Sequence, residues 1–325
     1  MPPPAYTYLT GSDWERRIAA LHQIGSHCAL CPRRCGVDRH AGETGFCGAP
    51  PGLVISSFFP HHGEEPPLSG TGGSGTVFFT HCTLKCLFCQ NYQISHEGEG
   101  RLFSEVELSH QLLRLQALGC HNINLVTATH LLPWILPALR RAAGEGINLP
   151  VVYNCGGYEL PETIDLLKDV VDIWLPDMKY GDNAPARRYS AAPDYVEVNR
   201  TAIRHMFRQV GPLQVDANGI AERGLLIRHL VLPHGESASP ALLDFLKRTF
   251  DPQDITVSLM AQYRPLYHAC GHPPIQAPLT PEAYGPVKAA FLEAGFGGFF
   301  QEIEKLDTAF VIDFTQRKEE PLTGA

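Results

Sequence analysis

The amino-acid sequence predicts an α/β protein whose core is a partial, TIM-like (β/α)6 barrel of parallel strands. From residue 75 onward, short segments rich in β-branched and aromatic residues alternate with longer segments of helical periodicity. Most of the strand segments are apolar on both faces, which is typical of parallel strands covered by helices. Strand–helix units in series require right-handed crossovers, so the sheet is expected to close wholly or partly and to carry functional residues at the carboxyl ends of its strands.

Six segments are predicted as the parallel strands, and helices connect them. The strands are expected at 76–80, 123–128, 151–154, 171–175, 225–232 and 255–260. The clearest helix follows the first strand, since Ser104 and Glu107 form a capping box at its start. Three later helices are expected to begin near Pro161, Pro240 and Pro281, because proline is well tolerated in the first turn.

The composition narrows the possible classes of protein. The chain has 325 residues, of which 44% are hydrophobic, and a formal net charge of −8. Ordinary apolar content argues against disorder, and the lack of a basic excess argues against nucleic-acid binding. The longest apolar stretch, residues 131–139, is too short to span a membrane. The N-terminus lacks the apolar segment of a secretory signal, so a cytoplasmic location is expected.

The chain is expected to have three parts. Residues 1–70 read as an irregular, cysteine-rich segment with one short helical pattern, and a segment with so few periodic apolar residues needs a bound metal to hold it together. Residues 71–313 are predicted to form the barrel. Residues 314–325 are predicted to be a frayed tail.

Three cysteines after the first strand form the strongest motif. Cys82, Cys86 and Cys89 have the spacing C-x3-C-x2-C. Three thiolates on one short loop suit an iron–sulfur cluster, and because a [4Fe–4S] cluster usually takes four cysteines, three leave one iron open for chemistry. A structural zinc site with a distant fourth ligand and a set of unliganded core cysteines are the alternatives.

This motif, with Phe88 as the aromatic residue before the last cysteine, resembles that of the radical S-adenosylmethionine (SAM) superfamily. Residues 61–95, HHGEEPPLSGTGGSGTVFFTHCTLKCLFCQNYQIS, also resemble the branch related to pyruvate formate-lyase activating enzymes, often called PflX-like. The resemblance implies a [4Fe–4S] cluster whose open iron chelates SAM. It also implies reductive cleavage of SAM to a 5′-deoxyadenosyl radical that takes hydrogen from a substrate, and a flavodoxin- or ferredoxin-type reductant.

On this resemblance, the protein is expected to be an oxidoreductase of the activating-enzyme type that acts on a partner protein, such as a glycyl radical enzyme. A related alternative is a maturase that acts on a small molecule or a peptide. An alternative of another class is a non-catalytic iron–sulfur protein that serves as an electron carrier or scaffold.

Charged residues on the later strands are candidates for SAM binding. Asp177 and Lys179 stand two apart at the carboxyl end of the fourth strand and therefore share a face. They match the Asp-x-Lys element of activating enzymes, which implies that they hold the zwitterionic end of SAM; a surface ion pair is the alternative. Arg228 is a lone charge inside the fifth strand, and its anionic partner is expected to be either the SAM carboxylate or an internal carboxylate.

Short polar residues at two other strand ends are further candidates for contacts with SAM. Thr127 and Thr129 end the second strand, where many radical SAM proteins carry a Gly-Gly-Glu-like element that this chain lacks. Asn154 ends the third strand, where activating enzymes have short polar residues near SAM.

Four cysteines near the N-terminus form a second candidate metal site. Cys28, Cys31, Cys35 and Cys47 have the spacing C-x2-C-x3-C-x11-C. Four thiolates, with glycines nearby that let backbone N–H groups approach sulfur, make a closed site. Zinc, an auxiliary iron–sulfur cluster and free thiols all fit this pattern.

The loop before the first strand carries polar residues whose role the sequence leaves open. His61, His62, Glu64 and Glu65 either flank the substrate or cluster, or are solvated loop residues, which we favour. Residues 70–75 satisfy G-x-G-x-x-G, but they precede a strand, so no dinucleotide site is expected there.

Overall fold

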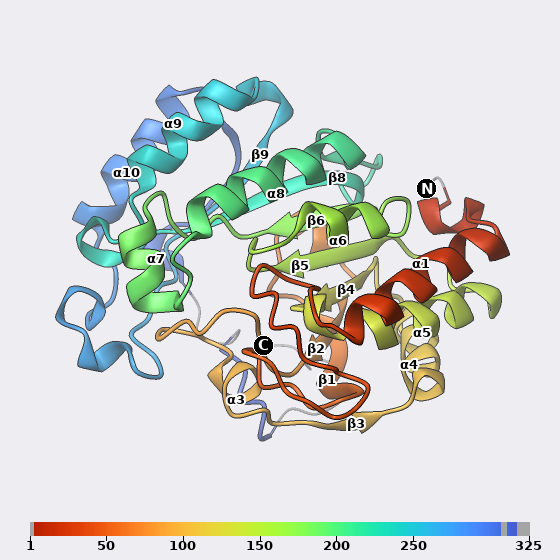
Figure 1. Ribbon diagram of the computed structural model, residues 1–325. Helices are drawn as coiled ribbons and strands as arrows, with labels where there is room; N and C mark the ends of the chain where they lie inside the picture. The colour runs from red at the N-terminus through yellow and green to blue at the C-terminus, as the bar shows by residue number, and fades with distance from the viewer. Residues whose placement is uncertain (1–2, 307–310, 317–325) are drawn as a thin grey trace.

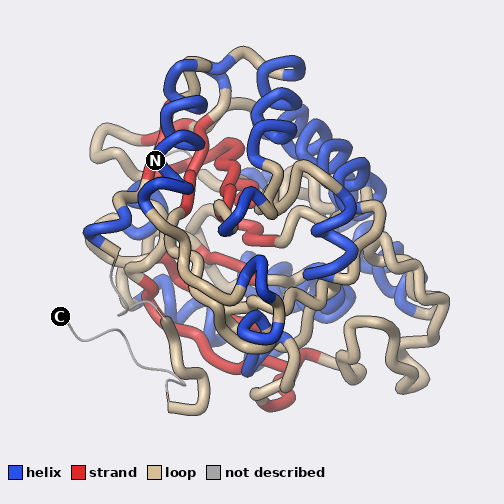
Figure 2. Tube along the Cα trace, turned by 90° about the vertical axis from the view of Figure 1, so that its left-hand side faces the viewer, coloured by secondary structure: helices blue, strands red, loops and turns tan. Residues whose placement is uncertain are grey.

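The computed structural model describes residues 3–306 and 311–316 of the chain. Seven strands run parallel and curve into a partial barrel (Figures 1 and 2). They are β2 (Ser74–Phe79), β4 (Ile123–Val126), β5 (Val151–Cys155), β6 (Ile173–Pro176), β8 (Ala221–Leu230), β9 (Thr256–Met260) and β10 (Gly297–Phe300). Three antiparallel strands complete the sheet: β1 (Leu53–His61), β3 (Arg101–Phe103) and β7 (Gln214–Val215).

The strand order confirms the predicted partial barrel. It is β10-β9-β8-β6-β5-β4-β2-β1-β3, with β7 paired to β8, and in the described residues nothing joins β10 to β3. All six predicted strands are present as β2, β4, β5, β6, β8 and β9, with ends displaced by a few residues. The last parallel strand, β10, is missed because it has four residues and begins with two glycines, which are depleted in strands.

Helices cover the outer side of the sheet (Figure 2). The longer ones are α1 (Gly11–Gly25), α4 (Glu105–Ala117), α5 (Leu132–Gly144), α7 (Asn183–Ser190), α8 (Tyr195–Val210), α9 (Ser239–Thr249) and α10 (Pro281–Glu293). The shorter ones are α2 (Pro66–Ser69), α3 (Tyr92–Ser95), α6 (Pro161–Leu166) and the 3-10 turns Ala5–Tyr8, Thr129–Leu131, Pro233–Gly235, Pro252–Asp254, Ala269–Gly271, Pro273–Ile275 and Ile303–Lys305. The predicted capping box is confirmed, because Ser104 Oγ accepts from Glu107 N at 3.1 Å while the Glu107 carboxylate accepts from Ser104 N at 2.7 Å.

Strand β1 corrects the expectation that residues 1–70 are irregular. Its nine residues are all buried, and it pairs antiparallel with β2 in the main sheet. The sequence conceals this strand because Pro60 and two serines interrupt its apolar pattern, and the pairing shifts register between Ile55 and Ser57 as at a β-bulge.

Because β1 is antiparallel, it delivers the following loop to the amino end of the barrel. His61 at the end of β1 pairs with Ser74 at the start of β2. The short helix α2 then closes the barrel from below, where its Leu68 packs among interior side chains of the parallel strands: Val152, Ile173, Leu175 and Leu226. The amino end of the barrel is therefore plugged, and the carboxyl end is left for a site.

The C-terminal segment is partly ordered against the barrel, which corrects the predicted tail in one place. Phe314 is fully buried, and its ring lies 5.1 Å from that of Phe78 on β2. Asp313 Oδ1 also accepts a hydrogen bond from the side chain of Gln93 at 3.1 Å. Residues 317–325 of the predicted tail lie outside the described residues.

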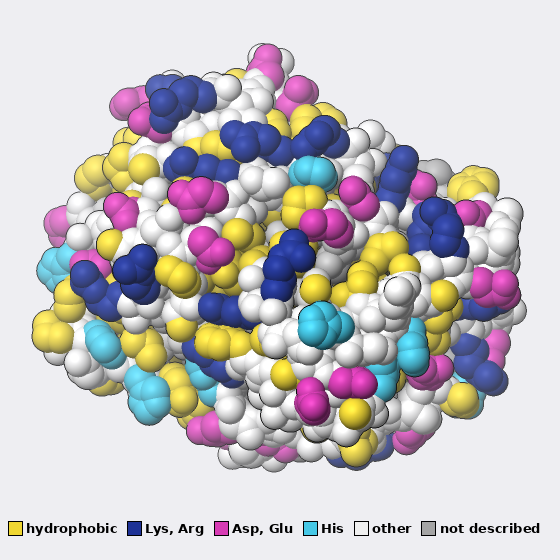
Figure 3. Space-filling view, in the orientation of Figure 1, with side chains coloured by type: hydrophobic (Ala, Val, Ile, Leu, Met, Phe, Trp, Pro, Cys, Tyr) yellow, Lys and Arg dark blue, Asp and Glu magenta, His cyan; other side chains and the backbone are white. Residues whose placement is uncertain are grey.

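The surface agrees with a chain of modest negative charge. On the face seen in Figure 3, basic and acidic side chains are interspersed among polar and hydrophobic ones. Within the described residues, no helix combines the length and the apolar character needed to cross a bilayer.

Candidate active site

The carboxyl ends of the parallel strands surround a cavity of about 240 Å³. Loops after β2, β4, β5, β6 and β9 supply much of its wall, as expected for a barrel of this kind. The charged side chains in the wall are Glu64, Asp177, Lys179, Arg228 and Arg264. Apolar side chains close part of the rim, among them Phe78, Phe88 and Ile312.

The three cysteines of the predicted cluster motif all line this cavity. Cys86 is buried, and Cys82 and Cys89 are half-buried. Burial raises the pKa of Cys82 to about 12 and that of Cys89 to about 11, and it also raises the pKa of Cys86. Without a metal these thiols are protonated at neutral pH, so a bound metal is what converts them to thiolate ligands.

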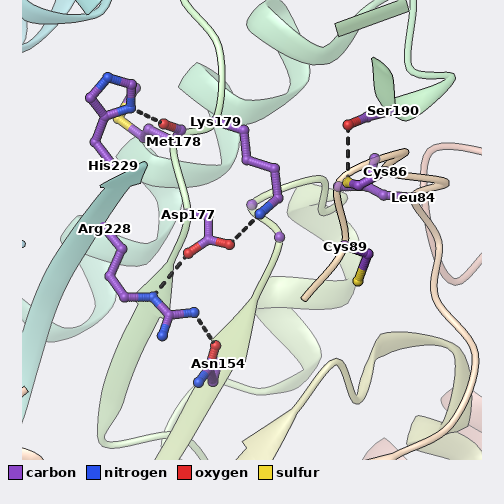
Figure 4. Close-up of polar contacts among 12 residues, drawn as sticks. Leu84, Cys86, Cys89, Asn154, Asp177, Met178, Lys179, Ser190, Arg228 and His229 are labelled. Atoms are coloured by element: carbon purple, nitrogen blue, oxygen red, sulfur yellow. Dashed lines mark hydrogen bonds and ion pairs between the residues drawn. The ribbon is translucent and has the colours of Figure 1, made fainter. Parts of the chain in front are cut away.

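Each of the three sulfurs has a hydrogen-bonding partner, which suits thiolates that carry negative charge when a metal is bound. The pairs are Leu84 N with Cys82 Sγ (3.4 Å), Ser190 Oγ with Cys86 Sγ (3.0 Å) and Ser95 Oγ with Cys89 Sγ (3.1 Å). Because Ser190 belongs to α7, this helix supports the cysteine loop from outside (Figure 4).

A row of charged side chains crosses the cavity beside the cysteines. Asp177 accepts from Arg228 Nε at 2.9 Å and from Lys179 Nζ at 2.5 Å, and Lys179 extends toward the cysteine loop (Figure 4). Arg228 Nη2 donates to Asn154 Oδ1 at 2.5 Å. Although burial acts to raise it, the ion pairs with Arg228 and Lys179 lower the pKa of Asp177, so its carboxylate is ionised at neutral pH.

Four of the predicted site residues therefore lie together: Asn154, Asp177, Lys179 and Arg228. The side chains of Asp177, Lys179 and Arg228 are between 13% and 18% exposed, so the alternative of a surface ion pair is wrong. The internal carboxylate partner expected for Arg228 is confirmed as Asp177, with Glu64 as a second one.

Glu64 and Glu65 correct the expectation of a solvated loop. The Glu64 side chain is 8% exposed and lines the cavity, and Glu65 is also buried. His62 is exposed as expected, whereas His61 at the end of β1 is buried. No sequence signal identifies these carboxylates, because adjacent acids beside prolines are usually exposed and only the plugging of the barrel by α2 turns them inward.

The two threonines after β4 point to different places. Thr127 lines the cavity and has a φ of +59°, which is rare for a β-branched residue. Thr129 lies outside the cavity wall, because its hydroxyl donates to Glu159 at 2.8 Å and accepts from the Tyr153 hydroxyl at 3.0 Å. Thr127 thus joins the site, and Thr129 does not.

The four N-terminal cysteines lie close to one another. Cys28, Cys31 and Cys47 are buried and Cys35 is half-buried. Gly36 N, next to Cys35, donates to the Cys28 carbonyl oxygen at 3.0 Å, and Phe46 N, next to Cys47, donates to Cys35 Sγ at 3.2 Å. The segments that carry these cysteines therefore lie side by side, while the second metal site stays a prediction.

This N-terminal group is held against the cysteine loop of the cavity. Lys85 Nζ donates to the Cys47 carbonyl oxygen at 3.2 Å, and Arg33 Nε donates to the Thr83 carbonyl oxygen at 2.9 Å. Lys85 and Thr83 both lie between Cys82 and Cys86, so the two groups of cysteines are neighbours in space.

The donor set of the cavity is three soft sulfur ligands on one loop, and this set fits an iron–sulfur cluster. In the described residues, neither here nor at the N-terminal cysteines are three or more His, Cys, Asp or Glu side chains placed to hold one metal ion. Three inward thiols beside paired carboxylate and cationic groups therefore suit a cluster with a zwitterionic ligand next to it.

Comparisons with known proteins give a family match and a curated relative. A family model described as the radical SAM superfamily matches residues 76–209. An uncharacterized protein of Methanocaldococcus jannaschii, MJ0674, is 30% identical over 282 residues, which cover 85% of this chain and 77% of that protein.

Two solved structures are more distant likenesses. A radical SAM methyltransferase from Sphaerobacter thermophilus aligns with 69% of this chain and 66% of its own at a TM-score of 0.45 and 14% identity. HydG, a maturase of the [FeFe]-hydrogenase, aligns with 74% of this chain and 53% of its own at a TM-score of 0.46 and 13% identity. The chain thus spans about two thirds of the first structure and about half of the second.

Proposed function

Because the chain belongs to the radical SAM superfamily, we propose that it cleaves SAM reductively in the cavity at the carboxyl end of the barrel. Membership of this superfamily implies a [4Fe–4S] cluster and SAM as cofactors. The observation that carries this proposal is the meeting of Cys82, Cys86 and Cys89 with the Asp177 ion pairs in one cavity. When bound, the cluster supplies one electron to the sulfonium of SAM, which yields methionine and a 5′-deoxyadenosyl radical that abstracts hydrogen from a substrate.

The residues of the chain have separate tasks in this proposal. The three cysteines hold the cluster and leave one iron without a protein ligand. Lys179 and Arg228 place positive charge where a carboxylate binds, and Asp177 fixes both cations in position. Phe78 and Phe88 in the wall exclude water, which strengthens these electrostatic contacts and protects a reactive intermediate.

The activating-enzyme subtype is a finer part of the proposal. It is supported by the resemblance of residues 61–95 to the PflX-like branch and by the Asp-x-Lys element at Asp177 and Lys179. On this basis the hydrogen donor is a glycine of a partner protein, and the electron comes from a flavodoxin- or ferredoxin-type reductant. A maturase of a small molecule or peptide uses the same site with a different substrate.

A direct assay tests SAM cleavage. The protein is reconstituted anaerobically with iron and sulfide and mixed with dithionite and SAM, and 5′-deoxyadenosine is measured by chromatography. We expect product from the wild type and from Cys120→Ala, whose buried cysteine lies outside the cavity wall, and none from Cys86→Ala. If the wild type forms no product and Cys86→Ala keeps its iron, the protein is instead an electron carrier or scaffold, or binds no cluster here.

We further propose that Cys28, Cys31, Cys35 and Cys47 bind a second metal, either zinc or an iron–sulfur cluster, which would draw together thiols that do not converge on one ion in the described residues. Their spacing and the burial of three of the four support it. Metal analysis of Cys31→Ala should show the loss of this metal with the SAM-cleaving cluster retained, whereas the exposed Cys270→Ala should lose nothing. Equal metal content in all three proteins would mean that the N-terminal thiols are free.

A further inference from the structure

The loop after β4 supplies the cavity with no carboxylate. Its residues are Thr127, Ala128 and Thr129, in place of the Gly-Gly-Glu-like element of many radical SAM proteins. In the described residues, the acidic side chains of the cavity wall are Glu64 and Asp177. An ammonium group that enters the cavity therefore has these two carboxylates as its candidate partners.

Asp177 is already saturated by cations. One of its oxygens faces Arg228 Nε at 2.9 Å, and the other faces Lys179 Nζ at 2.5 Å. A third cation would have to displace one of these buried partners, and breaking a buried ion pair leaves an uncompensated charge. Asp177 is thus poorly placed to receive an ammonium group.

Glu64 has room for one more donor. Its Oε1 accepts from Asn124 Nδ2 at 3.0 Å and from Asn154 Nδ2 at 3.1 Å, and its Oε2 accepts from Arg228 Nη1 at 3.2 Å. An ionised carboxylate accepts about four hydrogen bonds, so these three contacts leave a lone pair of Oε2 for a ligand. Two of the three donors are neutral amides, which position the carboxylate without neutralising it.

Arg228 beside it keeps donors for the opposite charge. Its guanidinium group has five N–H groups, and the contacts to Asp177, Glu64 and Asn154 occupy three of them. Glu64, which can accept from an ammonium group, therefore lies next to Arg228, which can donate to a carboxylate. This arrangement recognises the α-amino acid group of a ligand.

We propose that Glu64 binds the α-ammonium group of SAM, with Arg228 as the partner of its α-carboxylate. The inference rests on the proposed function. It means that the loop between β1 and α2, and not the loop after β4, supplies the carboxylate for the ammonium group. It also explains why two strands place amides, Asn124 and Asn154, against one carboxylate far from the exposed surface.

The test compares three ligands with the cluster-loaded protein by anaerobic titration calorimetry. SAM and S-adenosylhomocysteine share the amino acid group, and only SAM carries the sulfonium. The third ligand, 5′-methylthioadenosine, lacks the amino acid group. We expect Glu64→Gln to weaken the binding of the first two about tenfold to hundredfold and that of 5′-methylthioadenosine by less than about twofold.

Two further variants keep the test informative. Glu159→Gln is the matched control, because Glu159 is a buried glutamate outside the cavity wall that bonds with Thr129, and the affinity of this variant for SAM should equal that of the wild type. Glu64→Asp keeps the charge but withdraws it from the ligand. If Glu64→Gln does not fold, the same selective loss in Glu64→Asp supports the inference.

Each other result overturns the assignment. Equal losses for all three ligands mean that Glu64 only maintains the shape of the cavity. A loss for SAM alone means that Glu64 faces the sulfonium. If the wild type forms 5′-deoxyadenosine and Glu64→Gln binds SAM as tightly as the wild type, Glu64 is removed from the site and the proposed function stands. A wild type that neither binds nor cleaves SAM refutes the proposed function itself.

Discussion

Replacing His229 by glutamine should make the folded protein less sensitive to acid. His229 is fully buried on β8, next to Arg228. Its Nδ1 donates to the Met178 carbonyl oxygen at 2.6 Å (Figure 4), so the neutral ring accepts at Nε2 from the Ser239 hydroxyl at 2.8 Å. The ring thereby ties β8, which carries Arg228, to the residue between Asp177 and Lys179.

The size of the effect follows from the pKa of this ring. Burial lowers the pKa of His229 to about 4, against 6.5 for an ordinary histidine. Between these values the unfolded chain binds a proton that the folded chain does not, so the free energy of unfolding decreases as the pH falls. From pH 7 to pH 5 this one group costs about 2 kcal/mol of stability.

Urea unfolding followed by tryptophan fluorescence measures this difference. The full-length wild type should lose about 2 kcal/mol more between pH 7 and pH 5 than His229→Gln, whose amide can donate and accept but does not titrate. His110→Gln, an exposed histidine on α4, should keep the pH dependence of the wild type. An equal pH dependence in wild type and His229→Gln would refute the assignment of a neutral, buried ring.

Three further predictions concern the site, a helix start and the C-terminal segment. Asp177→Asn should weaken SAM binding while the absorption spectrum of the cluster is retained, because Lys179 and Arg228 lose the carboxylate that fixes their positions; unchanged affinity would remove Asp177 from the site. Ser104→Ala should lower the free energy of unfolding by about 1 kcal/mol in urea, since α4 loses its capping box, and a change within a few tenths would contradict this. Phe314→Ala should expose the C-terminal segment to limited proteolysis, because its contact with Phe78 is lost, and an unaltered cleavage pattern would show that other contacts hold the segment.

The parallel strands could be predicted because their signal is local. Strands such as β5 and β6 are buried on both faces, and helices with clear starts separate them. The period of two along a strand also placed Asp177 and Lys179 on one face, where they pair. The cysteine motif belongs to one short loop, so its residues are close in space whatever the rest of the fold does.

The residues that could not be predicted depend on long-range structure or on a change of backbone conformation. Glu64 enters the cavity only because β1 runs antiparallel and delivers its loop beneath the barrel. Thr129 shares the parity of Thr127, but the chain leaves the extended conformation at Thr127, where φ is +59°, and alternation no longer applies beyond that point.

The two ends of the barrel differ in how their stability arises, and this difference locates the chemistry. At the amino end, α2 packs apolar side chains into the interior. At the carboxyl end, His81 and Thr127 line the cavity with φ values of +65° and +59°, which cost roughly 1–3 kcal/mol each in residues other than glycine. Such backbone persists only where neighbours fix it: His81 N donates to the Ile94 carbonyl at 2.8 Å, and Thr127 N donates to the Asn154 carbonyl at 2.8 Å. The end that carries the three cysteines therefore combines strained backbone with buried ion pairs, and the packed amino end supplies rigidity that helps to hold this arrangement in place.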